Sequence, residues 1–281
     1  MSVTSSSGLR RASRQGMFVA GTIITLAVVL FAVFGPFFAP YGENEIVGPP
    51  FSSGPGIFGT DYLGQDVWSR FLYGGRSILV MAAVATGIGL VFGIAIGLIA
   101  AYARNALDDV LMRAMDVIMA FPQIMLALVA VSLLGAKLWI IIVAIALTTA
   151  PRVARVARGA AQPVVERDFI AATESMGVPR FRILSGELFP NILGPMMVES
   201  ALRLTYSIGV IAALAFLGLA PDPNGANWGS MINQNQIALS TQPWGALAPI
   251  IAIALLTMGT GLIGDGVART AAGIDRERGD E

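Results

Sequence analysis

The chain has 281 residues, of which 55% are hydrophobic and 13% are charged, about half of the roughly 25% charged residues in a typical soluble domain. Acidic and basic residues balance to a net charge of +0, a value that says nothing useful about nucleic acid, and no nucleic-acid partner is expected. The chain contains no cysteine and no histidine, which excludes disulfides, thiol chemistry and the usual zinc ligands.

Apolar stretches long enough to cross a bilayer, which takes about 20 residues in a helix, dominate the sequence. They are Met17–Ala39, Ser77–Tyr102, Met115–Leu134, Leu138–Val156, Asn191–Leu219 and Trp244–Val267. The chain is therefore predicted to be an all-α integral membrane protein with six transmembrane helices. The first stretch is longer than the core of a typical secretory signal, so we interpret it as a retained helix.

Basic residues are spread unevenly over the predicted connections. If the N-terminus is cytoplasmic, Arg70, Arg76 and Lys137 lie outside and nearly all other arginines lie inside, as the positive-inside rule requires. Six spans then return the C-terminus to the cytoplasm. The predicted divisions are an N-terminal tail (1–16), a first helix with an outer loop (17–76), a transmembrane core (77–270) and a C-terminal tail (271–281).

The connections and spans carry several local signals. Gly64–Arg76, late in the first outer loop, is expected to form an amphipathic element at the membrane surface. Residues 220–243, rich in proline and glycine, are predicted to form a second outer loop. Pro122 and Pro151 are expected to bend the third and fourth spans.

Small residues recur every four positions along the second span, at Ala85, Gly89, Gly93 and Gly97. Such a ridge lets two helices approach closely in lipid. We interpret it as a surface for packing inside the protein.

A polar helix–turn–helix is predicted from Asp168 to Asn191, between the fourth and fifth spans. Asp168 is expected to cap the first helix, and Gly177 to end it in a left-handed conformation. One apolar stripe comprises Phe169, Ala172, Thr173 and Met176, and a second comprises Phe181, Leu184 and Leu188, with Pro190 closing the unit. These stripes have nothing within the element to cover them, so we expect a separate motor subunit to dock here.

Residues for catalysis are scarce. The chain lacks a phosphate-binding Gly-x-x-x-x-Gly-Lys loop, and an enzymatic activity is not expected. Glu199 and Arg203 lie four residues apart within the fifth span and are expected to pair. They are either part of a translocation path, touching charged groups of a substrate, or a structural ion pair between helices, and we favour the structural interpretation.

Three arginines, Arg152, Arg155 and Arg158, recur every three residues near the cytoplasmic end of the fourth span. Contact with the motor subunit or lipid head groups, and a solvated row facing lipid, are both compatible with this pattern. Arg113 and Asp116 lie close together on the third span, where placement at the membrane interface is expected.

Several motifs together resemble the C-type permease subunit of dipeptide/oligopeptide, or peptide/nickel-type, ABC importers. The motifs are Phe58-Gly59-Thr60-Asp61, Leu63-Gly64-Gln65-Asp66, Ser69-Arg70, Arg113 with Asp116 and Pro122, Ala171-Ala172-Thr173 with Gly177 and Pro190, Phe216-Leu217-Gly218-Leu219, Pro223 with Trp228-Gly229, and Gly264-Asp265-Gly266 with Arg269. The resemblance covers roughly residues 17–270. Ala171 stands where the family's cytoplasmic loop has glutamate, and Glu187-Leu188-Phe189-Pro190 replaces its His-x-Leu-Pro.

The resemblance implies a mechanism and a set of partners. Two ATPase subunits or domains, which carry ATP and magnesium, would grip the helix–turn–helix of this chain and of a second homologous permease. Closure of the ATPases would open the path outward in a bacterial cytoplasmic membrane. The path would then accept peptide from an extracytoplasmic binding protein, while this chain itself holds no cofactor and no metal.

The outer loops are expected to meet that binding protein through Asp61, Asp66, Trp68 and Trp228, which suit a mixed polar and apolar contact. Related permeases carry nickel or glutathione, so the substrate stays open at this point. A self-contained secondary transporter or channel, and a membrane scaffold without a transport role, are the alternative classes.

Overall fold

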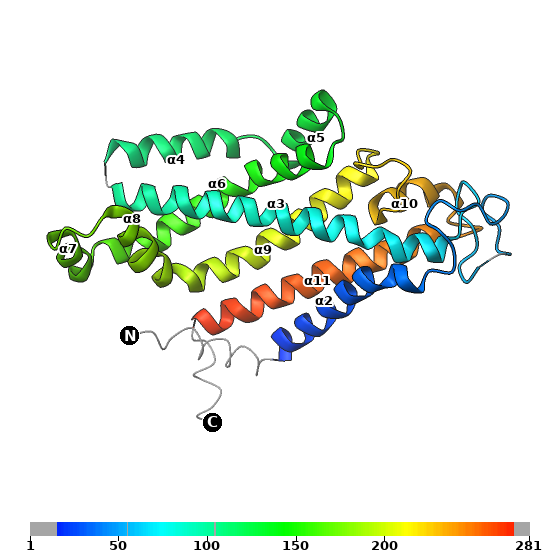
Figure 1. Cartoon of the computed structure of the whole chain (residues 1–281), viewed down its shortest axis with the longest axis horizontal. Helices are drawn as coiled ribbons and strands as arrows, with labels where there is room; N and C mark the ends of the chain where they lie inside the picture. Colours follow the sequence, from blue (N-terminus) through cyan, green and yellow to red (C-terminus); the bar gives the residue numbers. More distant parts are fainter. Residues whose placement is uncertain (1–15, 55, 104, 273–281) are drawn as a thin grey trace.

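The computed structural model describes residues 16–54, 56–103 and 105–272, and folds them into a bundle of long helices (Figure 1). The predicted tails at 1–16 and 271–281 lie almost entirely outside the described residues. The long helices of the bundle are α2 (Gly16–Phe34), α3 (Val67–Ala103), α6 (Leu138–Val165), α9 (Phe189–Phe216) and α11 (Trp244–Ala272). The all-α prediction is confirmed.

Five of the predicted spans are single helices, and the remaining one is broken. Helix α4 (Ala106–Met119) and helix α5 (Gln123–Leu134) meet at an angle of 76°, so there are six spans if this bent pair counts as one. Pro122, which lacks an N–H, stands directly before α5 and separates the two helices. The predicted bend at Pro122 is therefore a full break.

The structure differs from the prediction in three places. Residues 67–76 are the first turns of α3 and not a separate surface element, so the division proposed at residue 77 falls inside a helix. Asp66 explains the early start, because its carboxylate accepts hydrogen bonds from the N–H (2.8 Å) and hydroxyl (2.6 Å) of Ser69. Helix α6 continues past residue 156 to Val165, and the second outer loop contains the short helix α10 (Trp228–Asn235) followed by η3 (Gln236–Ala238).

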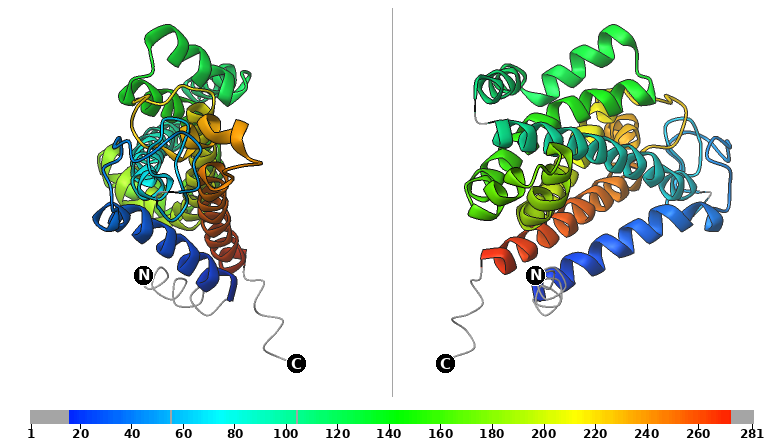
Figure 2. Two further views of the ribbon diagram at one scale, coloured as in Figure 1. Left: turned by 90° about the vertical axis from the view of Figure 1, so that its right-hand side faces the viewer. Right: turned by 60° about the vertical axis from the view of Figure 1, so that its left-hand side comes forward.

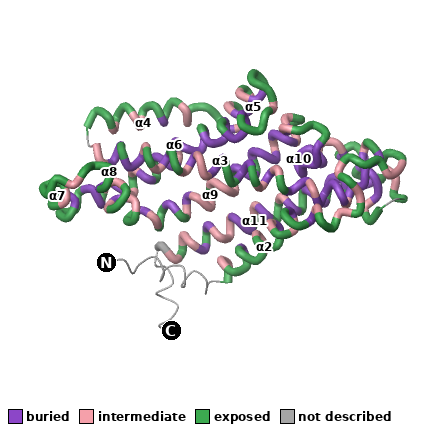
Figure 3. The backbone as a smooth tube through the Cα atoms, in the orientation of Figure 1, coloured by how far each residue is buried: buried purple, intermediate pink, exposed green. Residues whose placement is uncertain are grey.

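Helix α3 lies directly against α6, and the ridge of small residues makes this possible. A Cβ atom at Gly93 would lie 2.6 Å from the carbonyl oxygen of Ala150, and one at Gly97 would lie 2.5 Å from that of Ala154. The predicted role of this ridge in internal packing is confirmed. Buried residues, coloured purple in Figure 3, are concentrated in the centre of the bundle, whereas α4, α5 and α7 are largely exposed and coloured green.

The two ends of the bundle differ in character. The loop of residues 39–66 and α10 lie at one end, and the short helices α7 (Asp168–Ser175) and α8 (Arg180–Arg182) lie at the other (Figures 1 and 2). Helix α2 starts, and α11 ends, on the side of the bundle toward α7 and α8. Many large apolar side chains on the outer faces of the helices are exposed, including Ile23, Val91 and Val143, as expected for surfaces that meet lipid.

The contact of α3 with α6 predicts a difference between two glycine substitutions in one helix. Gly93→Ala should destabilise the protein by about 1–3 kcal/mol, because the new methyl group meets backbone and a Val153 carbon at 2.6 Å. Gly87→Ala should be neutral or slightly stabilising, because no atom lies within 4 Å of its Cβ position and alanine favours the helix. Thermal unfolding of the two purified variants measures the difference, and equal midpoints would contradict the role of the ridge.

Candidate functional site

The turn between α7 and α8 is a well-formed helix C-cap. Gly177 has a φ of +73°, and its N–H donates to the carbonyl of Glu174 at 2.9 Å, while the N–H of Val178 donates to that of Thr173 at 3.3 Å. This is the Schellman arrangement, in which the left-handed residue directly follows the helix. The predicted role of Gly177 is confirmed.

Asp168 lies in the first turn of α7, and this helix has no side-chain cap, so the predicted capping by Asp168 is wrong. The negative charge of Asp168 instead interacts favourably with the positive N-terminal end of the helix dipole.

Buried apolar residues fix this element, which we call the knob (residues 168–189), to the bundle. Ile170, Ile183 and Leu188 are almost completely buried in a cluster with the ends of α3, α6 and α9. Leu188 thus belongs to the interior and not to a docking stripe. The sequence analysis did not single out Ile170, which directly follows the exposed Phe169, or Ile183, which directly precedes the partly exposed Leu184.

The outer surface of the knob exposes large apolar side chains. Phe181 is 80% exposed, Met176 is 74% exposed and Phe169 is 37% exposed. Among the other predicted coupling residues, those that are exposed or partly exposed are Asp168, Ala171, Ala172, Thr173, Gly177, Leu184 and Pro190. The knob therefore presents an apolar surface that nothing in the described part of the chain covers.

The second helix of the knob has no break at its end. After α8 the chain passes through a π-helical segment (Ile183–Leu188) directly into α9. Pro190 lies in the first turn of α9, where proline is tolerated, so it does not close the knob as predicted. A displacement of the knob can therefore pass directly into a membrane-spanning helix.

At the opposite end, Asp61 organises the outer loop from inside. Its carboxylate accepts hydrogen bonds from the N–H groups of Leu63 and Gln65, both at 2.9 Å, and lies 3.3 Å from the guanidinium of Arg70. Both charged side chains are 1% exposed. Burial raises the pKa of the Asp61 carboxyl, against the opposing effects of the Gln65 N–H and the Arg70 charge.

Trp228 holds the second outer loop onto α3. Its indole N–H donates to the carbonyl of Phe71 at 2.9 Å, and its ring stacks on that of Phe71 at 5.7 Å. A Cβ atom at Gly75 would lie 2.6 Å from the indole, so this glycine makes room for it. Asn227 caps α10 by accepting from the N–H of Gly229 at 2.9 Å.

These positions change the interpretation of the outer-loop residues. Asp61, Asp66 and Trp228 are at most 1% exposed, and Trp68 is partly buried. Burial leaves Asp61, Asp66 and Trp228 no side-chain surface for a partner, so the structure does not support direct contact of these three with a binding protein. The loops themselves expose other apolar side chains, namely Ile46, Ile57, Leu63 and Ile237.

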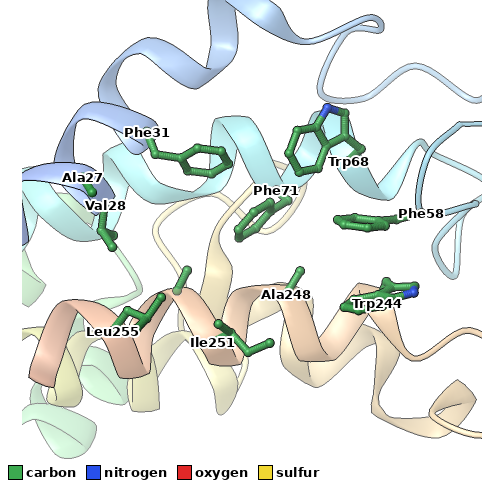
Figure 4. A pocket seen from close by; sticks show the side chains of 11 residues that line it. Ala27, Val28, Phe31, Phe58, Trp68, Phe71, Trp244, Ala248, Ile251 and Leu255 are labelled. Atoms are coloured by element: carbon green, nitrogen blue, oxygen red, sulfur yellow. The ribbon is translucent and has the colours of Figure 1, made fainter. Parts of the chain in front are cut away.

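Aromatic rings join the outer loop to the bundle. Phe58 packs edge-on against Trp68 (5.2 Å) and stacks on Trp244 (4.9 Å), while Phe31 lies 5.1 Å from Phe71. They line an apolar cavity of about 400 Å³ between α2, α3 and α11 (Figure 4). Phe58 thus ties the outer loop to helices from both ends of the sequence.

In the fifth span, Glu199 and Arg203 form the predicted ion pair, with Arg203 Nε 2.8 Å from Glu199 Oε1. Both side chains are largely buried, at 9% and 14% exposure. The guanidinium of Arg203 also lies 5.9 Å from the ring centroid of Tyr206, and that of Arg152 lies 5.6 Å from the same centroid. The pair is confirmed, and its place on a translocation path stays a prediction.

The arginines of α6 have different partners. Arg155 pairs with Asp116 of α4, and Arg158 binds both carboxylate oxygens of Asp108 at 2.6 Å each. These two residues therefore tie the broken span to the bundle, a role that the sequence did not indicate. Arg152 lies apart from them, on the face of α6 toward α9.

Comparison with known families identifies the chain. A model described as "binding-protein-dependent transport system inner membrane component" matches residues 93–271, and one described as "N-terminal TM domain of oligopeptide transport permease C" matches residues 6–52. The chain belongs to the binding-protein-dependent transport permeases. It is a multi-pass inner-membrane permease component of an ABC importer.

Relatives agree with this family, and a solved structure shares the fold. The dipeptide transport system permease protein of Alkalihalophilus pseudofirmus is 33% identical over 92% of this chain and 86% of its own length. The glutathione transport system permease protein of Pectobacterium atrosepticum is 32% identical over 92% and 87%. The inward-facing MetNI methionine ABC transporter matches the fold with a TM-score of 0.57 and 20% identity, covering 72% of this chain and 96% of that one.

The Glu199–Arg203 geometry predicts a structural effect. Glu199→Gln should lower the stability of the permease by about 2–4 kcal/mol, because a largely buried arginine loses its counter-charge. Exchanging the pair, with Glu199→Arg and Arg203→Glu together, should restore much of the lost stability. Thermal unfolding of the three proteins measures this, and no recovery in the exchanged protein would rule out a simple structural pair.

Proposed function

We propose that this chain is one of two permease subunits of an ATP-driven importer that moves short peptides inward from an extracytoplasmic binding protein. The apolar surface of the knob, continuous with α9, carries the proposal. Separate ATPase subunits would bind ATP and magnesium and grip that surface, since the chain lacks a phosphate-binding loop. Relatives named as dipeptide and glutathione permeases support a peptide-like substrate.

Coupling would run from the knob through continuous backbone. ATP binding closes the two ATPases, and the exposed Met176 and Phe181 transmit the movement to the π segment and α9. Buried Ile170 and Ile183 make the knob move as one body with the ends of α3 and α6. With Ala171 in place of a carboxylate, we expect apolar contact to supply most of the docking energy.

The opposite end would receive the binding protein. The exposed Ile46, Ile57 and Ile237 lie on the outer loops and η3, and the buried Asp61–Arg70 pair and Trp228 hold these loops in place. In this arrangement the N- and C-termini are cytoplasmic, on the side of the ATPases. Nickel is the alternative substrate, and transport without an ATPase is an outcome that the experiments below would reveal.

Matched substitutions at the two ends test the assignment of partners. Phe181→Asp should weaken binding of the ATPase subunits by roughly tenfold or more while leaving binding-protein docking intact, because it places a charge in an apolar contact. Ile57→Asp, the same kind of change on a 71% exposed residue at the other end, should have the opposite pattern. Co-purification of the assembled complex and binding-protein affinity provide the readouts. Peptide uptake by the permease without ATPases would contradict the importer.

Two glycines of the knob provide a second test of coupling. Gly177→Ala should cost about 1–2 kcal/mol, because alanine is strained at a φ of +73°, and should reduce ATP hydrolysis stimulated by the loaded binding protein. Gly186→Ala serves as the control, because it has equally open surroundings without the positive φ. If both variants hydrolyse ATP and import peptide like the wild type, the knob turn has no part in coupling.

A further inference from the structure

Two arginines from different helices share one aromatic ring. Arg152 of α6 and Arg203 of α9 place their guanidinium carbons 5.6 Å and 5.9 Å from the centroid of Tyr206. Such distances are within the range of cation–π attraction, which stabilises a cation that is withdrawn from water. The ring therefore holds two positive groups near each other at the contact of α6 with α9.

The charges in this cluster do not balance. Arg203 is neutralised by Glu199 at 2.8 Å. Arg152 has no carboxylate within 4 Å in the part of the chain that the structure describes, whereas Arg155 and Arg158 on the same helix pair with Asp116 and Asp108. The positive charge of Arg152 is thus left without an anion among the described residues, and its guanidinium makes a cation–π contact with the face of Tyr206.

The unpaired charge lies within the fourth span, toward the end predicted to be cytoplasmic. Arg152 is about 21 Å along α6 from Leu138, and Arg203 is about 20 Å along α9 from Phe216, at the rise of an α-helix. The hydrocarbon core of a bilayer is roughly 30 Å thick. Cations at such depth usually face an interior path or a partner, because exposure to lipid is costly.

The cluster is also accessible. Tyr206 is 48% exposed, and Arg152 and Arg203 are each partly exposed. The exposed part of the Tyr206 ring and the partly exposed Arg152 guanidinium are therefore accessible to a ligand, whereas Arg203 is largely buried. The planar guanidinium of Arg152 presents paired donors that match a carboxylate.

We propose that Arg152, with Tyr206 behind it, is a transient binding site for the carboxylate of the substrate during its passage through the membrane. This proposal rests on the importer function above and specifies which substrate group is recognised. Tyr206 keeps the guanidinium in place when the site is empty, so binding stays weak enough for the substrate to leave. The Glu199–Arg203 pair limits the net charge to one, which matches the single carboxylate at a peptide's C-terminus.

Ligand-observed NMR titrations of the assembled permease–ATPase complex, without the binding protein, test the site directly. The probes are Ala-Phe and its C-terminal amide, which differ in the carboxylate alone. The wild type should bind Ala-Phe more tightly than the amide, and Arg152→Gln should reduce that preference by roughly tenfold or more. Arg152→Lys should retain part of it, because the charge remains and the paired donors do not.

Arg155→Gln is the matched control, three residues along the same helix, and should keep the wild-type preference. Equal affinity of the wild type for the two probes, or an unchanged preference in both Arg152 variants, would overturn the proposal. If the Arg152→Gln variant does not assemble, the Arg152→Lys variant tests the proposal by itself. A preference for Ala-Phe over its amide as strong as in the wild type would then exclude the paired-donor contact. Uptake of Ala-Phe by the complete wild-type importer is measured in parallel. Uptake of Ala-Phe together with equal binding of Ala-Phe and its amide would contradict the carboxylate site. Preferential binding of Ala-Phe without its uptake would contradict the proposed peptide import.

Discussion

The close contact between α3 and α6 is the constraint on which the rest of the structure depends. Transmembrane helices already satisfy their backbone hydrogen bonds internally, so van der Waals packing is a main source of stability between them. Gly89, Gly93 and Gly97 allow the backbones of α3 and α6 to approach closely enough for such packing. The paired helices position the other elements. Helix α9 and the knob pack on one end through Ile183 and Leu188, and the outer loops pack on the other through Trp228. The two surfaces that we propose for partners, at opposite ends of the molecule, are therefore held by one packed core.

The two ends use different physical means to present their surfaces. The knob is anchored by buried aliphatic residues and leaves Met176 and Phe181 exposed, which suits a partner that must grip and pull. The outer end is instead fixed by buried polar groups, with Asp61 accepting two backbone hydrogen bonds beside Arg70. Hydrogen bonds to a buried charge define a loop conformation more narrowly than apolar contact does. A loop of that kind can receive a second protein without first becoming ordered.

The charged residues of α6 divide into structural and unpaired groups along a single helix. Arg155 and Arg158 reach across to α4 and hold the broken span, whereas Arg152 turns toward α9 and the ring of Tyr206. A row of arginines that looked uniform in the sequence thus makes two kinds of contact. The difference arises from which neighbouring helix lies opposite each residue. Spacing along one helix does not contain that information.

The sequence by itself determined the helical class, the spans, the left-handed Gly177 and the pairing of Glu199 with Arg203, because each depends on local apolar length, backbone conformation or spacing within one helix. It also carried the family resemblance. Tertiary structure alone decided that Asp61, Asp66 and Trp228 are buried. It likewise decided that Arg152 meets Tyr206. These features depend on contacts between residues far apart in the chain. The sequence pattern of a loop is the same whether its polar or aromatic side chain is exposed to a partner or buried beneath the loop.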